Sequence, residues 1–184
     1  MPSLELEDYA RQIDSVNAAA QAIVDNHTAA QLSTPTASGG WSPVECLDHI
    51  AATAATYIPV IAAALKEGRA KGLLAEGPFH YGFLSRMFLW TLEPPVRIRF
   101  KAPRIFAPRP QPDVKSSLAS YLSRHLELQE LLKEAEGLDL ATIRVTSPAN
   151  EKLKFPVGAA FGILTAHARR HLWQARRALN ESGT

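Results

Sequence analysis

Four segments of the chain repeat their apolar residues every three to four positions, over residues 4–32, 42–68, 113–136 and 156–180. This spacing is typical of an amphipathic helix with one apolar stripe. A single such helix would leave its stripe exposed to water, so several of them pack together around a shared core. The sequence therefore predicts an all-α fold, a four-helix bundle, in a single domain over residues 1–184.

The connection between the second and third predicted helices, residues 69–112, is too long for a structureless loop in a compact domain. Residues 81–92 are apolar and favour a short helix that ends before Pro94 and Pro95. Residues 96–101 then alternate apolar and basic side chains, as an extended segment does. We expect a long, partly irregular connection in place of the short turn of a simple up-and-down bundle.

The overall charge and the cysteine content exclude several classes of protein. Twenty lysines and arginines against eighteen aspartates and glutamates leave a net charge of +2, too small for a strong field toward nucleic acid or an anionic membrane. Cys46 is the single cysteine, which excludes an intrachain disulfide framework and a multi-cysteine zinc module. The longest apolar run, residues 57–65, is too short to span a bilayer, and the acidic N-terminus does not match a signal peptide. We expect a cytoplasmic protein that binds neither nucleic acid nor membrane.

The fourth predicted helix carries His167 and His171, four residues apart. Side chains at this spacing project from the same helix face, so the two imidazoles can bind one metal ion. The rest of that face is apolar, and we expect both rings to point into the bundle. The alternative is a pair of core histidines hydrogen-bonded by their neighbours, because the glutamate that metalloproteases place between two such histidines is missing here.

A third histidine, His49, lies in the second predicted helix. The start of that helix is well marked, with Ser42 as N-cap, Pro43 at the first helical position and Glu45 three residues after the cap. Three histidines from two helices leave an open coordination position, as catalytic metal sites do. Neutral imidazole suits Zn, Ni, Fe or Cu, and the sequence does not choose among them.

The two histidine-bearing segments resemble the helix signatures of the DinB-like superfamily, in its YfiT-like branch of metal-dependent hydrolases. The long connection between the second and third helices fits the same plan. The matching residues are 41–43, 45, 47 and 49–50 in the second helix, and 162–167 and 170–174 in the fourth.

The resemblance implies a four-helix bundle that holds a divalent metal ion through His49, His167 and His171. Family members with assigned activities are mostly metal-dependent thiol S-transferases that use a low-molecular-weight thiol such as bacillithiol or mycothiol. The resemblance therefore implies that this chain is a thiol S-transferase or a hydrolase that acts on a small molecule. A low-molecular-weight thiol is the candidate cofactor. The alternative is a non-catalytic, metal- or ligand-binding or dimerising helical module.

Two polar residues beside the predicted ligands are candidates for a catalytic role. Glu45 lies four residues before His49, where its carboxylate can orient the imidazole or act as a base. It can equally serve as the capping-box partner of Ser42. Gln174, three residues after His171, is expected either to hydrogen-bond a metal-bound water or to fill the core.

Other residues support weaker predictions. Cys46 is a candidate nucleophile or ligand, but a buried structural thiol is commoner. His125 lies in the apolar stripe of the third predicted helix and is expected to be a core histidine or to line a pocket. The apolar segment over residues 83–90 is a candidate homodimer surface. Five cations follow without an intervening acid and are expected to bind an acidic substrate or to form a solvated loop: Arg97, Arg99, Lys101, Arg104 and Arg109.

Overall fold

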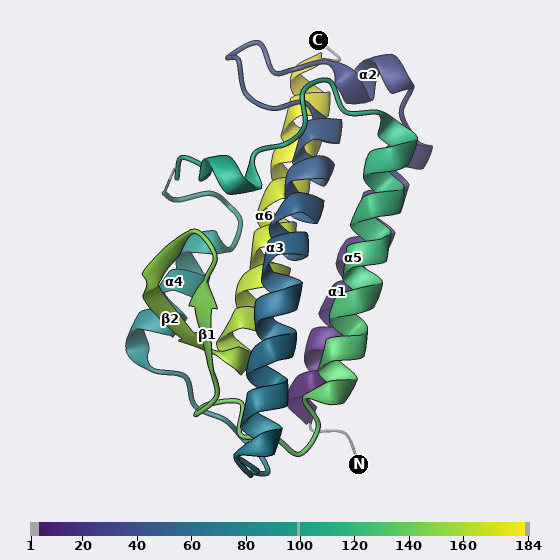
Figure 1. Ribbon diagram of the computed structural model, residues 1–184. Coiled ribbons are helices and arrows are strands. Elements are labelled where there is room, and N and C mark those ends of the chain that lie inside the picture. The colour runs from purple at the N-terminus through teal and green to yellow at the C-terminus, as the bar shows by residue number, and fades with distance from the viewer. Residues whose placement is uncertain (1–3, 99, 183–184) are drawn as a thin grey trace.

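The computed structural model describes residues 4–98 and 100–182 of the chain. Four long helices lie side by side as a bundle, which confirms the predicted fold class (Figure 1). Helix α3 packs against α5 and α6, and α1 packs against the same two helices. The four are α1 (Leu4–Asp25), α3 (Pro43–Ala70), α5 (Val114–Glu134) and α6 (Val157–Ser182).

The bundle core divides into two large clusters of buried apolar side chains along the helix axes. One cluster joins Ile61 and Leu65 of α3 to Phe161 of α6. The other joins residues of α3 that precede and follow His49 to Ala168 and Leu172 of α6. Each fully buried leucine stabilises the folded chain by about 1.5–3 kcal/mol relative to an exposed one. The second cluster therefore holds the histidine-bearing turns of α3 and α6 against each other.

Helix α3 begins as the sequence predicts. The Ser42 hydroxyl accepts a hydrogen bond from the backbone N–H of Glu45 at 3.3 Å, and the Glu45 carboxylate accepts one from the Ser42 backbone N–H at 2.8 Å. Pro43 occupies the first turn, where its missing N–H costs nothing. This capping box fixes the start of α3 and, with it, the direction in which His49 projects.

Two parts of the chain differ from the helical prediction. The first predicted helix breaks after α1, and a short helix α2 (Ala29–Ser33) begins at Thr28, whose capping box with Gln31 starts a new turn. Residues between α5 and α6 form an antiparallel hairpin of β1 (Arg144–Ser147) and β2 (Asn150–Pro156), which the periodicity did not predict. Strand β2 runs directly into α6, so the hairpin sets where α6 begins.

The long connection between α3 and α5 contains the predicted short helix, α4 (Phe83–Leu92), and a single 3₁₀ turn, η1 (Arg104–Phe106). Helix α4 packs on α6, and η1 packs on α3, so the connection crosses the bundle beside both histidine-bearing helices. The described residues of the predicted extended segment form no strand, and Arg99 lies outside the described residues. The connection is thus partly irregular, as expected.

Among the described helices, α3 alone is long and apolar enough to cross a membrane. The core helix of a bundle has the same length and composition, and α3 also buries Asp48 and His49. More than half of its most apolar stretch is buried inside the protein. The apolar character of α3 therefore fits its position in the core.

Candidate metal centre

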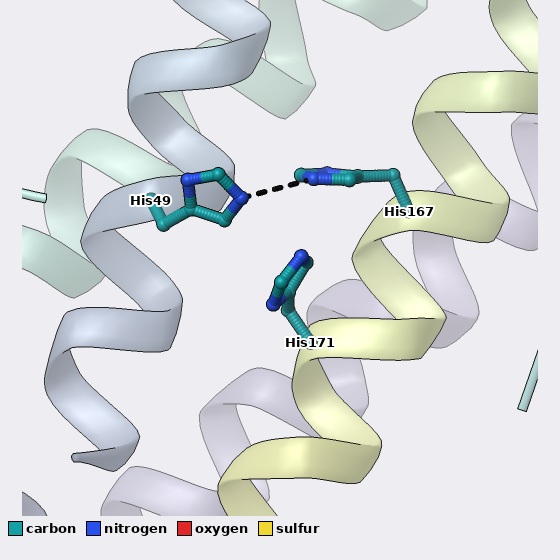
Figure 2. A group of neighbouring side chains, drawn as sticks. All are labelled: His49, His167 and His171. Carbon is teal, nitrogen blue, oxygen red and sulfur yellow. Dashed lines mark hydrogen bonds between the residues drawn. The ribbon is translucent and has the colours of Figure 1, made fainter. Parts of the chain in front are cut away.

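His49 on α3 and His167 and His171 on α6 converge in the space between the two helices, as Figure 2 shows. One ring nitrogen of each residue lies within 4.8 Å of the other two. The Nε2 atoms of His49 and His167 are 3.0 Å apart. The structure thus brings the three sequence-predicted metal ligands together, and we refer to them as the histidine triad.

Hydrogen bonds fix the tautomers of two triad rings. The carbonyl oxygen of Phe106 lies 2.6 Å from Nδ1 of His49, and since a carbonyl only accepts, that nitrogen carries the proton. Nδ1 of His171 donates in the same way to the side-chain oxygen of Gln174 at 3.1 Å. Both rings are left with a lone pair on Nε2, the form that binds a metal.

Burial keeps the triad in its neutral form. His49 is 2% exposed and His171 is 9% exposed. Desolvation lowers the pKa of His49, His167 and His171 below the ordinary value for histidine. The pKa values of His167 and His171 are lowered further by the neighbouring histidines and by the charge of Arg170. Neutral imidazole is the ligand form, so the triad is ready to coordinate near neutral pH.

The donor set fits a divalent transition metal. The Nε2 atoms of His49 and His167 are 3.0 Å apart, so lone pairs on both nitrogens would repel each other. A proton on His167 Nε2 or a metal ion bound by both nitrogens removes this repulsion. Two nitrogens bound to one tetrahedral zinc at about 2.0–2.1 Å are about 3.4 Å apart, only a few tenths of an ångström more than the separation here. Zn, Ni and Fe all accept three imidazoles.

A buried carboxylate next to the triad anchors the loop that orients His49. Asp48 accepts hydrogen bonds from the Arg109 backbone N–H at 2.7 Å, from the Arg109 guanidinium at 2.9 Å and from the Ser117 hydroxyl at 3.3 Å. Burial alone would raise the pKa of Asp48, but the hydrogen bonds from Arg109 outweigh it and hold that pKa below its usual value. These contacts, which we call the Asp48–Arg109 clamp, tie the segment that follows η1 to α3, close in sequence to the Phe106 carbonyl that contacts the His49 ring.

Sequence reasoning missed this clamp. Asp48 sits on a buried face of α3, and a carboxylate at such a position indicates a specific partner. The Phe106 carbonyl is a backbone group, so no residue type in the sequence indicates its hydrogen bond with His49. Phe106 also lies 57 positions from His49, beyond the reach of any local motif.

Trp41 covers the triad. Its ring centroid lies 4.5 Å from that of His49 and 5.7 Å from that of His171. Trp41 immediately precedes the N-cap Ser42 in the chain. The apolar ring shields one side of the triad from water.

The two residues predicted to assist catalysis have defined contacts. The Glu45 carboxylate is engaged by Ser42, and the His49 ring is oriented by the Phe106 carbonyl. The capping alternative for Glu45 is therefore the one seen, while its use as a base stays a prediction. Gln174 contacts the triad through His171, and its predicted contact with a metal-bound water likewise stays a prediction.

The weaker candidates lie outside the triad. Cys46 is fully buried, and burial raises the pKa of its thiol, with the charge of Glu45 adding to the effect. The thiol therefore stays protonated at neutral pH. His125 is 3% exposed and bonds the Asn17 side chain between α5 and α1.

The basic loop is divided among different contacts. Arg109 binds Asp48, and the Arg97 guanidinium lies 4.6 Å from the ring centre of Trp90. Lys101 and Arg104 are exposed. The described cations of this loop therefore do not form one cluster at the triad.

With this geometry established, comparison with known proteins places the chain in a family. A model of the DinB superfamily matches residues 12–175, and the chain belongs to that superfamily. Among solved structures, it is similar to YfiT from Bacillus subtilis, with a TM-score of 0.64 and 18% sequence identity over 97% of this chain and 87% of that one. That protein is described as "a probable metal-dependent hydrolase with an unusual four-helix bundle topology". No curated protein was found to be similar.

Proposed function

We propose that this protein is a metal-dependent enzyme, of the hydrolase or thiol S-transferase type, that acts on a small molecule at the histidine triad. The observation that carries the proposal is the convergence of three neutral imidazoles from two helices within 4.8 Å. Membership of the DinB superfamily and the description of YfiT as a metal-dependent hydrolase support the same conclusion.

The donor set favours a catalytic over a structural metal site. Structural zinc sites are closed by four protein ligands, whereas three histidines leave a position for water or substrate. A divalent ion held here would lower the pKa of a bound water or thiol toward neutrality. The hydrolase and thiol S-transferase types therefore need the same triad and differ in what occupies the open position.

The residues around the triad prepare it for this chemistry. The Phe106 carbonyl and the Gln174 side chain hold protons on the outward nitrogens of His49 and His171. Trp41 excludes water from one side. An apolar surround strengthens every electrostatic interaction at the centre, including those that stabilise a developing negative charge.

Turnover assays test the proposal directly. Protein loaded separately with Zn, Ni or Fe(II) would be assayed for ester and amide hydrolysis and for thiol transfer with bacillithiol and mycothiol. His171→Ala, loaded in the same way, is the matched control. We expect activity in at least one assay that His171→Ala lacks. Equal rates for the parent and the variant would contradict the proposal.

A second candidate, a non-catalytic dimerising module, is favoured by one observation. Phe83, Leu84 and Trp90 of α4 are more than half exposed, and large exposed apolar side chains in a group mark interaction surfaces. Sedimentation velocity at micromolar concentration tests it. A dimer that Trp90→Glu converts to monomer supports this candidate, and a monomer throughout contradicts it.

A further inference from the structure

Arg170 is a buried cation on the same helix as two triad ligands, one residue before His171. It is 6% exposed. Its guanidinium donates to the backbone carbonyl of Thr91 at 3.0 Å and to that of Ile98, and it lies 5.5 Å from the ring centre of Phe100. These carbonyls satisfy hydrogen bonds but carry no negative charge. Burying a cation without a counter-charge is costly, so a functional reason is expected.

The carboxylates around this side of the bundle are already engaged. Asp48 pairs with Arg109, and Glu93 pairs with Arg169. No ion pair to Arg170 occurs within residues 4–98 and 100–182, the part of the chain that the structure describes. The charge of Arg170 therefore remains uncompensated beside the triad.

The triad adds no negative charge either. Its three imidazoles are neutral ligands, so a divalent ion bound there keeps its full charge. Arg170 lies on α6 between the two ligands of that helix, three residues after His167 and one before His171, so its charge belongs to the same turn of the helix. A metal-loaded centre would thus combine a divalent cation with a buried guanidinium, and an anion is needed to balance them.

We propose that the substrate carries a small oxyanion, a carboxylate or a phosphate, which Arg170 binds beside the metal. The inference rests on the proposed function and specifies its substrate class. A guanidinium has five N–H donors, and the Thr91 and Ile98 carbonyls take two of them. Its planar fork matches the oxygens of a carboxylate or phosphate. The two carbonyls fix the orientation of the fork without neutralising it.

A purely structural role for Arg170 makes a different prediction. The guanidinium joins α6 to the end of α4 and to the loop at Ile98, and this link alone would stabilise the fold. Loss of the link would lower the free energy of unfolding but would not change how the protein distinguishes an anion from a neutral molecule of the same shape. Anion binding therefore separates the two roles.

The test is isothermal titration calorimetry on zinc-loaded protein with acetate, inorganic phosphate and acetamide as probes. Metal content is measured first in the parent, Arg170→Gln, Arg170→Lys and Arg176→Gln. Arg176→Gln is the matched control, because Arg176 is an exposed arginine on the same helix and its loss changes the net charge equally.

We expect acetate or phosphate to bind the parent and acetamide not to bind. Arg170→Gln should weaken anion binding at least about tenfold, as loss of a charge-assisted contact does. Arg170→Lys keeps the charge but loses the planar fork, so it should weaken anion binding less than Arg170→Gln does, and Arg176→Gln should match the parent. The preferred probe identifies the oxyanion as carboxylate or phosphate.

Three results overturn the inference, and failure of the proposed function is distinguishable from failure of the inference alone. If the parent takes up no metal, the proposed function fails and the inference fails with it. If metal binds normally but anion affinity is the same in Arg170→Gln, only the inference fails. Should Arg170→Gln not fold, equal binding of acetate and acetamide by the parent overturns the inference without any variant.

Discussion

The protein buries histidines in two places, and the two places differ in what surrounds the rings. His125 lies between α5 and α1, hydrogen-bonded to Asn17 and edge-on to Tyr121. The triad lies between α3 and α6, with ring nitrogens of three histidines converging. His125 and His49 are almost equally buried, and desolvation lowers the pKa of both. Burial and a shifted pKa therefore do not define a metal site, whereas convergence of lone pairs does.

Of the differences between the two histidine regions, the pH dependence of stability conferred by His125 should be the largest. Burial lowers the pKa of His125 to about 4 in the folded chain, against about 6.5 when unfolded. Between these values the unfolded chain binds a proton that the folded chain does not, so the free energy of unfolding falls as pH drops from 6.5 to 4. This one group accounts for about 3 kcal/mol of that loss.

Urea unfolding of metal-free protein at several pH values measures the effect of His125. His125→Gln removes the titrating group, so the fall in unfolding free energy between pH 6.5 and 4 should be smaller by about 3 kcal/mol than in the parent. Zinc should bind His125→Gln as tightly as it binds the parent, because His125 lies outside the triad. Weakened zinc binding in the variant would contradict the distinction between the two histidine regions.

The next largest effect is on metal affinity and concerns the contacts between Asp48 and Arg109. Arg109→Gln removes the guanidinium contacts to Asp48 and leaves the Phe106 carbonyl less firmly placed. Loss of a group that orients a metal ligand typically weakens metal affinity about 10–100-fold. Competition with a zinc chelator measures it, with Arg104→Gln, an exposed arginine of the same loop, as control. Unchanged affinity in Arg109→Gln would show that the clamp only stabilises the fold.

The smallest effect concerns the cap of α3. Ser42→Ala removes the acceptor for the Glu45 backbone N–H and should cost about 1 kcal/mol of unfolding free energy. Glu45→Gln, which preserves a capping box, should cost less than this. Both variants should bind one metal, because the Phe106 carbonyl orients His49. If Glu45→Gln keeps its metal but loses turnover, Glu45 acts as a base in addition to its role in the cap.

The sequence predicted the features that depend on local pattern. Helical periodicity predicted the four-helix bundle. The spacing of His167 and His171 and the position of His49 made the three histidines candidate ligands, and the resemblance to the DinB-like superfamily implied that they act together. The break before α2 was missed because the periodicity continues across it, although Thr28 and Gln31 form a capping box like that of Ser42.

Contacts between residues far apart in the chain could not be predicted from local sequence pattern. The Phe106 carbonyl reaches His49 only because a loop of the long connection folds back on α3. Arg170 is one of several arginines in the fourth predicted helix, and local pattern does not indicate that its guanidinium contacts the end of α4 and the loop after it. Both contacts depend on the path of an irregular segment, which propensity and periodicity do not specify.

The two histidine regions should differ in metal binding: we expect the histidine triad to bind a divalent metal and His125 not to bind one. The most direct measurement is metal content by inductively coupled plasma mass spectrometry. It would compare tag-free parent, the His49→Ala/His171→Ala double variant and His125→Ala, each after incubation with Zn, Ni or Fe(II). The account predicts one metal per chain in the parent and in His125→Ala, and none in the double variant. Equal metal in the parent and the double variant, or none in the parent, would contradict it.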